Sequence, residues 1–392
     1  MYLLRNLQKK AMAALAMAGS VAACGAADLV KSGSEYPFLP SFPGDQMRPQ
    51  ISLNELGGYL VTQDNSIDGN GLGIRARKYY ADLSASRFTI QVNSEGRGEQ
   101  QNATVAVFAG GGAIFAWQGS TPAGNRVFVR ALNDAGTFFA PEIEASANAV
   151  GNQTEPSAAV LADGTAVVVW SEWNRDGHME GVFGQRFSAQ GSRLGATFRV
   201  NEAFRQSQRS PAVAALSNGN FVVVWVQEFA GIEQIPIYGR VFRSDGSPAG
   251  VSVRLNGSDR ICANPAVVAV GSGFRAAWSS RQPPPPATVN PDGFWVSAQV
   301  NLEGWDAVSR LFDSAASPVG NEATVNNTTK GDQFSPSLLN VGAGVLAVWT
   351  SYGQDGADEG IFGRTISSAG PEGTEFLVNT RTISKQRQPA LA

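Results

Sequence analysis

The sequence predicts an all-β protein, a β-propeller of six four-stranded blades. One pattern recurs along most of the 392 residues: a proline, then a glycine, then an apolar run that ends in tryptophan. Five copies end in Trp117, Trp170, Trp225, Trp278 and Trp349, which are 53 to 55 residues apart except for a last interval of 71. A period near 53 with several short strands per copy is typical of propeller blades.

Four strands are expected in each copy, and the fourth copy is the clearest. Its strands are expected at residues 212–216, 221–227, 237–242 and 251–255, separated by glycine-containing turns. The run from Val222 to Trp225 is apolar without a break, which predicts a strand buried on both faces. Such burial indicates sheets that stack on a neighbour at each side.

The outer copies depart from the pattern. The first covers residues 49–63 and has Gln63 where the others have tryptophan, and the long last interval contains Pro283 to Pro286. A seventh copy begins at Gln386 and reaches only its first strand by Ala392. The extra strand predicts either a closing element of a six-bladed ring or seven blades if the chain is a fragment.

Two amide residues recur in phase with the repeat. A glutamine stands three residues before the proline position, and an asparagine ends the fourth strand. The glutamines are Gln46, Gln100, Gln153, Gln208, Gln333 and Gln386, and the asparagines are Asn93, Asn201, Asn256, Asn326 and Asn379. We expect their amides to pair with loop backbone where one blade passes to the next.

The whole phrase resembles a repeat of large secreted and surface proteins of bacteria. It reads Gln-x-x-Pro, Gly-x-Phe-Val-Val-x-Trp, Asp-Gly, Gly-Ile-Phe-Gly-Gln-Arg-Phe and Phe-x-Val-Asn, and the likeness covers residues 46–392. The resemblance implies a propeller-like extracellular module, usually without an assigned enzyme activity.

The N-terminal residues predict export. Positive Arg5, Lys9 and Lys10 precede an uncharged stretch of 13 residues that ends at Ala23, which matches a secretory signal and is too short to span a bilayer. Residues 21–24 resemble a bacterial lipobox, which implies acylation of Cys24; ordinary secretion is the alternative. We therefore expect a signal peptide at 1–23, a lipidated cysteine and tether at 24–45, and the propeller at 46–392. The expected location is the outer membrane or cell surface, with the lipid as the only membrane anchor, or else the periplasm or medium.

The composition argues against a nucleic-acid partner. Charged residues make up 16% of the chain, and the net charge is −3. No block of lysine and arginine follows residue 10, whereas phosphate backbones require a concentrated basic face.

Three aromatic residues are the candidate ligand-binding side chains. Trp173, Phe229 and Tyr352 each follow a second strand, three or four residues after the repeated tryptophan, and are expected in loops on one rim. Exposed aromatics can stack on sugars or pack against a protein partner. Local loop packing is the alternative. The repeated tryptophans themselves are expected to pack between blades.

A calcium site is a weaker hypothesis. Asp64, Ser66 and Asp68 alternate before Gly69, which resembles the first half of an oxygen-ligand loop. The bidentate glutamate of such loops is absent, and Asp-Gly is also a common hairpin turn. We therefore expect no cofactor, with Ca²⁺ as the one exception to test.

No catalytic residue can be assigned from the sequence. His178 is the only histidine, and neither a Gly-x-Ser-x-Gly elbow nor a Ser-x-Asp-x-Gly-x-x-Trp box occurs. We expect a non-enzymatic binding or scaffold module for a protein or glycan. The rival hypothesis is a propeller hydrolase or lyase acting on extracellular polysaccharide, which a group of two or three carboxylates at the channel would favour.

Overall fold

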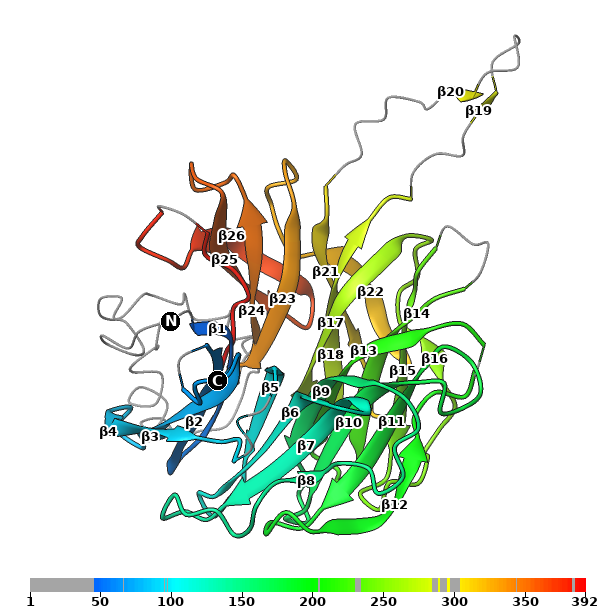
Figure 1. The fold of residues 1–392 in the computed structure, drawn as a ribbon. Coiled ribbons are helices and arrows are strands. Elements are labelled where there is room, and N and C mark those ends of the chain that lie inside the picture. The colour runs from blue at the N-terminus through cyan, green and yellow to red at the C-terminus, as the bar shows by residue number, and fades with distance from the viewer. Residues whose placement is uncertain are drawn as a thin grey trace, which may run out of the picture.

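The computed structural model confirms the expected fold class. It describes residues 46–392 except 66, 95, 97, 204, 230–233, 284–287, 290–294, 297–303, 343 and 383–384. Within this part of the chain, six antiparallel four-stranded sheets follow one another around a central channel, and no helix occurs (Figure 1). The predicted signal peptide, the tether and the lipidation site Cys24 lie outside the described residues.

Each blade is a meander whose first strand is innermost. Blade 1 contains β1 (Gln46–Asn54), β2 (Gly57–Asp64), β3 (Gly73–Tyr80) and β4 (Ala85–Gln91). Blade 2 contains β5 (Gln100–Val107), β6 (Ala113–Thr121), β7 (Gly124–Leu132) and β8 (Ile143–Glu144). Blade 3 contains β9 (Gln153–Val160), β10 (Ala166–Trp173), β11 (Glu180–Phe187) and β12 (Arg193–Arg199).

The second half of the ring repeats this order. Blade 4 contains β13 (Gln208–Ala215), β14 (Phe221–Gln227), β15 (Ile237–Phe242) and β16 (Val253–Arg254). Blade 5 contains β17 (Ile261–Val270), β18 (Gly273–Arg281), β21 (Asp306–Phe312) and β22 (Pro318–Thr324). Blade 6 contains β23 (Gln333–Asn340), β24 (Val345–Tyr352), β25 (Glu359–Ser367) and β26 (Gly370–Leu377). The long interval of the sequence lies between β18 and β21, where β19 (Thr288–Val289) and β20 (Trp295–Val296) pair with each other away from the ring (Figure 1).

The repeated tryptophans form the packing between blades, as expected. All five have at most 1% of their surface exposed, which excludes them as sugar platforms. Trp225, for example, lies in a cluster with Val169 and Val182 of blade 3 and Phe221 of blade 4. Burial of such large apolar side chains supplies much of the driving force for stacking the blades.

Blade 1 differs from the sequence alignment by one residue. Gln63 pairs with Ile74 in blade 1, and Ser171 pairs with Val182 in blade 3. Ile74 and Val182 are equivalent positions, because each donates its N–H to the asparagine that ends its blade, Asn93 and Asn201 respectively. The tryptophan position of blade 1 is therefore Thr62, and Gln63 occupies the place after it.

The recurrent amides join consecutive blades, as the sequence predicted. Asn201 accepts the N–H of Val182 and donates to the side-chain oxygen of Gln208 at 2.9 Å. The same pair of contacts occurs between Asn93 and Gln100, Asn326 and Gln333, and Asn379 and Gln386. Apart from Gln386, which is half-buried, these side chains are buried, and the bonds satisfy polar atoms that water does not reach.

The seventh copy lies along blade 6. Gln386 donates its N–H to the carbonyl of Glu359, Gln388 donates its N–H to the Thr350 hydroxyl, and Leu391 packs against the cluster around Leu346. Residues 386–392 thus occupy the position that a first strand takes beside the preceding blade. The C-terminus lies beside blades 1 and 6 in Figure 1.

Cys262 is a free, buried thiol. Burial raises the pKa of this thiol to about 12, so it is held as a neutral apolar group. No helix among the described residues is long and apolar enough to cross a membrane.

Candidate functional site

A channel runs along the axis of the ring and opens as a pocket of about 650 Å³. The first strand of every blade lines it, together with Gln388, Pro389 and Leu391. Such a volume lies within the range of about 300–1,000 Å³ that is usual for small-ligand sites. The innermost strands therefore decide which side chains a ligand meets.

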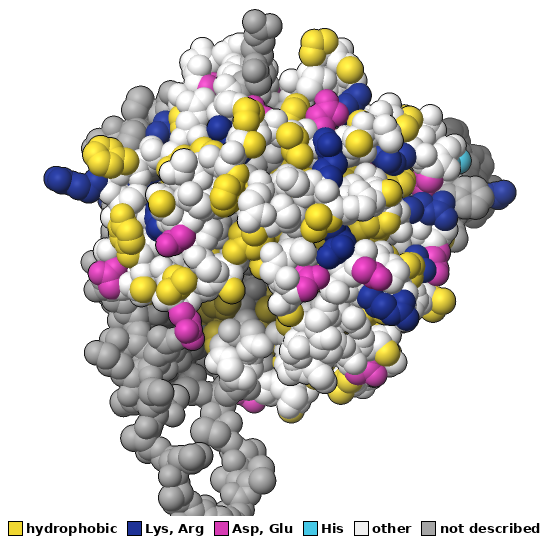
Figure 2. All heavy atoms as spheres, turned by 90° about the horizontal axis from the view of Figure 1, so that it is seen from below, with side chains coloured by type: hydrophobic (Ala, Val, Ile, Leu, Met, Phe, Trp, Pro, Cys, Tyr) yellow, Lys and Arg dark blue, Asp and Glu magenta, His cyan; other side chains and the backbone are white. Residues whose placement is uncertain are grey.

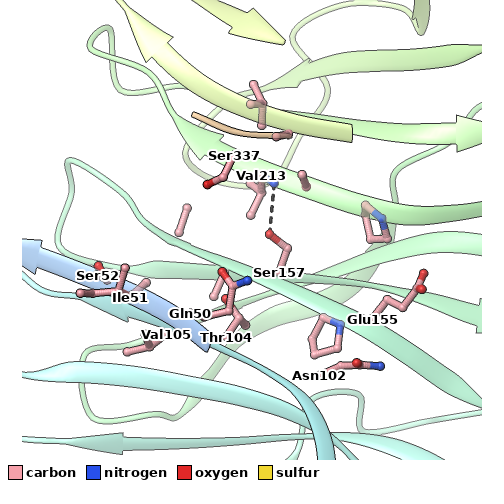
Figure 3. Close-up of a pocket in the computed structure, with 18 of the residues that line it drawn as sticks. Gln50, Ile51, Ser52, Asn102, Thr104, Val105, Glu155, Ser157, Val213 and Ser337 are labelled. Carbon is pink, nitrogen blue, oxygen red and sulfur yellow. Dashed lines mark hydrogen bonds between the residues drawn. The ribbon is translucent and has the colours of Figure 1, made fainter. Parts of the chain in front are cut away.

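One position of each first strand places a side chain at one end of this channel. This position stands directly before the repeated proline, or before Ala103 in blade 2. Its occupants are Arg48, Asn102, Glu155, Ser210, Asn264, Ser335 and Gln388, and we name these seven residues the channel ring. Figure 3 shows Asn102 and Glu155 at the same end of the pocket, away from Ile51 and Val105.

A β-bulge directs each of these side chains. All seven residues have a positive φ, between 49° and 57°. Register shifts mark a bulge in the six first strands, for example between Arg209 and Ala212. A left-handed residue other than glycine costs about 1–2 kcal/mol, and bulges that redirect a side chain are frequent beside functional sites. The strain is therefore concentrated where the channel opens.

Hydrogen bonds from the preceding blade hold the bulges in place. Ser210 donates its N–H to the Ser171 hydroxyl at 3.2 Å, and Ser335 donates its N–H to the Ser279 hydroxyl at 3.0 Å. Asn102 makes the equivalent bond to the side-chain oxygen of Gln63. The backbone of these three ring residues is thus held by the preceding blade, and Gln388 is held in the same way by the Thr350 hydroxyl.

A group of carboxylates meets the channel ring at blades 3 and 4. Glu155 accepts a 2.9 Å hydrogen bond from Ser210, and its charge acts on Glu180 at the start of β11. Glu228, which follows β14, also acts on Glu180, and Arg209 forms an ion pair with Glu228 at 2.7 Å. The charges of Glu155 in blade 3, of Glu228 after β14 in blade 4 and of Arg209 therefore all act on Glu180. We name Glu155, Glu180 and Glu228 the carboxylate group.

Glu180 has an altered proton affinity. Burial is the largest cause and raises the pKa of this carboxyl, and repulsion from Glu155 raises it further. Attraction to Arg209 and a hydrogen bond from Ser207 oppose these effects without cancelling them. A carboxyl that holds its proton to a higher pH than an ordinary glutamate, under the charge of a second carboxylate, has the property that the acid of an acid–base pair requires.

The structure separates the three predicted aromatic residues. Trp173 is 48% exposed and pairs with Glu180 across β10 and β11, so it borders the carboxylate group. Phe229 directly follows Glu228 and makes an edge contact with Tyr238, which agrees in part with local packing. Tyr352 is 51% exposed but belongs to blade 6, where it pairs with Glu359. Only Trp173 and Phe229 belong to the blades that carry the carboxylates.

The predicted calcium ligands have other partners. Asp64 is fully buried and forms a 2.6 Å ion pair with Arg75. Asp68 accepts a hydrogen bond from Asn93 and caps the turn at Asn70, while Ser66 lies outside the described residues. Among the residues that the structure describes, no group of three or more His, Cys, Asp or Glu side chains is placed to hold a metal ion. Calcium at this loop remains an untested hypothesis.

His178 stabilises the loops between blades 3 and 4. Its Nδ1 accepts a hydrogen bond from the backbone N–H of Gln206 at 3.1 Å, which supports the turn before β13.

Charged side chains of both signs are scattered over the face shown in Figure 2, without a patch of one sign.

Sequence reasoning missed the carboxylate group. Glu155, Glu180 and Glu228 come from two repeats, and nothing in their spacing along the chain shows that they meet. One signal was available at Glu155: the position before the repeated proline varies between copies, whereas its surroundings do not. A position that varies between copies while its neighbours stay constant is not required by the fold, so its side chain can be chosen for function.

Comparison with known proteins finds similar folds but identifies no family for the chain. No protein-family model and no curated protein matches the chain. Among solved structures, a protein of unknown function from Dyadobacter fermentans is 11% identical, with 72% of this chain and 83% of that chain covered and a TM-score of 0.51. The α-L-arabinofuranosidase of Fusarium graminearum in complex with arabinobiose is 11% identical, with 83% and 93% covered and a TM-score of 0.47. An endo-arabinase from Bacteroides thetaiotaomicron is 14% identical, with 59% and 88% covered and a TM-score of 0.39.

These findings correct the leading functional prediction. We expected a non-enzymatic binding or scaffold module, but several similar structures are glycoside hydrolases, namely an α-L-arabinofuranosidase, a family-43 glycoside hydrolase, an endo-arabinase and a sialidase. The prediction was wrong because the repeat pattern describes the fold, and a carboxylate on a propeller strand leaves no local sequence motif of activity. Likeness at this level of identity shows the fold alone.

Proposed function

We propose that this propeller is a glycoside hydrolase acting on extracellular polysaccharide, with its reaction at the carboxylate group of blades 3 and 4. The observation that supports it is that burial and then the charge of the channel carboxylate Glu155 raise the pKa of Glu180. Glycoside hydrolysis ordinarily uses one protonated carboxyl to donate to the leaving oxygen and one carboxylate to act on the sugar or on water. The predicted export of the chain is consistent with such a substrate.

Each member of the group has a distinct role in this proposal. Glu180 donates the proton, because burial holds it protonated at a higher pH than an ordinary glutamate. Glu155 is the carboxylate that faces the substrate, held by Ser210. Arg209 pairs with Glu228 and keeps that side chain ordered beside them. Trp173 offers a flat, half-exposed surface on which a sugar ring can stack.

A hydrolase agrees with these residues better than a lyase does. A lyase removes the proton next to a uronate carboxylate, and it needs positive charge to stabilise the anion that forms. Arg209 is already paired with Glu228, and its charge also acts on Glu180. The local charge therefore opposes the intermediate of an elimination.

Release of reducing sugar from a panel of neutral and acidic polysaccharides tests the proposal. Glu180→Gln keeps the size of the side chain but holds no transferable proton, so we expect its rate to fall at least ~100-fold, the usual contribution of a general acid. Glu359→Gln is the matched control, because Glu359 begins β25 as Glu180 begins β11 but lies in blade 6. The activity of the wild type should also fall as the pH rises through the pKa of Glu180. Failure of the wild type to release sugar from any member, or equal loss in both variants, would refute the proposal.

A further inference from the structure

Blade 3 contains a carboxylate that is sealed from solvent. Glu172 lies in β10, two residues after Trp170, and none of its surface is exposed. A buried carboxylate is costly unless hydrogen bonds and an opposite charge compensate for its lost hydration. Because Glu172 cannot touch a substrate from this position, its role follows from the groups that it binds.

Glu172 accepts hydrogen bonds from four separate parts of blade 3. The indole N–H of Trp170 donates to it at 3.1 Å, which fixes the carboxylate to the core. The side-chain amide of Gln153, at the start of β9, donates at 2.9 Å, and the backbone N–H of Val150 donates at 2.7 Å. Arg175, in the turn between β10 and β11, forms an ion pair with it at 3.0 Å. One buried side chain therefore holds a core residue, a loop, a strand and a turn.

The bond to Gln153 fixes the start of the first strand. Gln153 stands two positions before Glu155 in β9. Its amide oxygen accepts the backbone N–H of Val127 in blade 2 at 3.0 Å, while its amide nitrogen donates to Glu172. The amide is therefore held at both ends, and β9 enters the bulge at Glu155 from a fixed point.

The ion pair with Arg175 fixes the turn that carries two other residues of the site. Arg175 lies between Trp173 and Glu180, which pair with each other across β10 and β11. The same guanidinium donates to the Ser146 hydroxyl at 2.8 Å and to the Asn148 carbonyl at 2.9 Å. The turn is thereby joined both to Glu172 and to the loop before β9.

The fold does not require a carboxylate at this position. The equivalent residues of the other blades, two positions after the tryptophan position, are Asp64, Gly119, Gln227, Ser280 and Ser351. Beside Ser280 the indole N–H of Trp278 is buried without a hydrogen-bond partner among the described residues, and blade 5 forms nevertheless. Asp64 is the other carboxylate, and it pairs with Arg75 of its own blade. A glutamate with four groups of donors occurs in the blade that carries Glu155 and Glu180.

We propose that Glu172 is a positioning residue, which holds Trp173 and Glu180 in a fixed place relative to Glu155. This inference rests on the proposed function and assigns a further residue to the same site. A displacement of about 1 Å at a reacting centre can slow a reaction about 100-fold. Bonds from β9, from the loop before it and from the turn to one buried point oppose such a displacement.

Hydrogen exchange measured by mass spectrometry tests the positioning without a substrate. Glu172→Gln keeps the size of the side chain but replaces an acceptor oxygen with an NH₂ donor, which then faces other donors. We expect residues 146–153 and 173–180 to exchange at least ~10-fold faster than in the wild type, because the bonds that they share are weakened. Asp64→Asn is the matched control, since it disrupts an equally buried ion pair in blade 1 and should leave both segments unchanged. Unchanged exchange in Glu172→Gln, or the same increase in both variants, overturns the inference.

The pH dependence of polysaccharide cleavage is a readout that lost stability alone would not move. Burial is the largest cause of the raised pKa of Glu180, so a loosened turn hydrates Glu180 and lowers this pKa towards its ordinary value. In Glu172→Gln the fall in activity with rising pH should therefore begin at a lower pH. Its kcat should be at least ~10-fold below that of the wild type at a temperature at which both are folded. Asp64→Asn should keep the wild-type pH profile, and a wild-type profile and rate in Glu172→Gln overturn the inference.

Arg175→Met serves if Glu172→Gln loses the native far-ultraviolet circular dichroism. It removes the bond between the turn and Glu172 but leaves the buried carboxylate its donors from Trp170, Gln153 and Val150. We expect faster exchange at residues 173–180 and a pH profile shifted in the same direction. A folded Arg175→Met with the exchange and the profile of the wild type overturns the inference.

The two proposals fail in different ways. If the wild type cleaves no polysaccharide, the hydrolase is refuted, while hydrogen exchange still decides whether Glu172 orders the two segments. If Glu180→Gln abolishes cleavage and Glu172→Gln leaves it intact, the hydrolase stands and the positioning role is overturned.

Discussion

Replacing Trp225 by alanine removes the largest side chain between blades 3 and 4. Trp225 is 1% exposed, stacks on Tyr238 with ring centroids 6.3 Å apart, and lies in the cluster that contains Val169. A buried tryptophan removes about 150–250 Å² from water, which at ~25 cal/mol/Å² corresponds to about 4–6 kcal/mol. Because alanine retains part of this and the cavity relaxes in part, we expect a loss of about 3–5 kcal/mol in the free energy of unfolding.

Trp173 provides the comparison within the same chain. It is 48% exposed and ends the neighbouring β10, so Trp173→Ala returns only about half as much surface to water. We expect a loss of about 1–2 kcal/mol. Urea unfolding followed by circular dichroism compares the midpoints at a common slope. Trp225→Phe is the control for size and should lose less than Trp225→Ala. Equal losses for Trp225→Ala and Trp173→Ala would refute the assignment of core and rim.

Two further predictions concern buried charge. Because burial raises the pKa of Glu180, the folded state loses stability relative to the unfolded one as the pH rises above about 4.3. Glu180→Gln should therefore melt at a higher temperature than the wild type at pH 7 and at nearly the same temperature at pH 4, and a variant less stable at both would contradict this. Asp64→Asn should cost about 3–5 kcal/mol in urea unfolding, because it leaves Arg75 buried without its carboxylate. The control is Asp134→Asn, which removes the ion pair of Lys78 with Asp134, a side chain that is 71% exposed; it should cost under about 1 kcal/mol. Equal losses of stability in Asp64→Asn and Asp134→Asn would contradict the burial argument.

The architecture could be predicted because the same pattern of strands, turns and tryptophan recurs in several copies. Each copy carries its own strands, turns and buried tryptophan, so an error in one copy is corrected by the others. In blade 4, the expected strands at 221–227 and 237–242 coincide with β14 and β15. Blade 1, the most divergent copy, is where the alignment was wrong by one residue, since Thr62 and not Gln63 occupies the tryptophan position.

The site was not predictable in the same way. Glu155 and Glu228 are 73 positions apart, and each looks like an ordinary polar residue near a turn. Both charges act on Glu180, and burial is the largest cause of the raised pKa of Glu180. The spacing of residues along the sequence indicates neither which charges act on Glu180 nor how far Glu180 is buried.

The sequence by itself determined the fold class, the period of the blades and the role of the repeated tryptophans and amides, because these depend on local patterns that recur. Only the tertiary structure decided which residues face the channel, since a left-handed bulge before each repeated proline directs them there. It also decided which carboxylates meet. Closing strands from separate repeats around one axis brings together side chains whose interaction depends on distance in space and on exclusion of water, and neither is written in the order of residues.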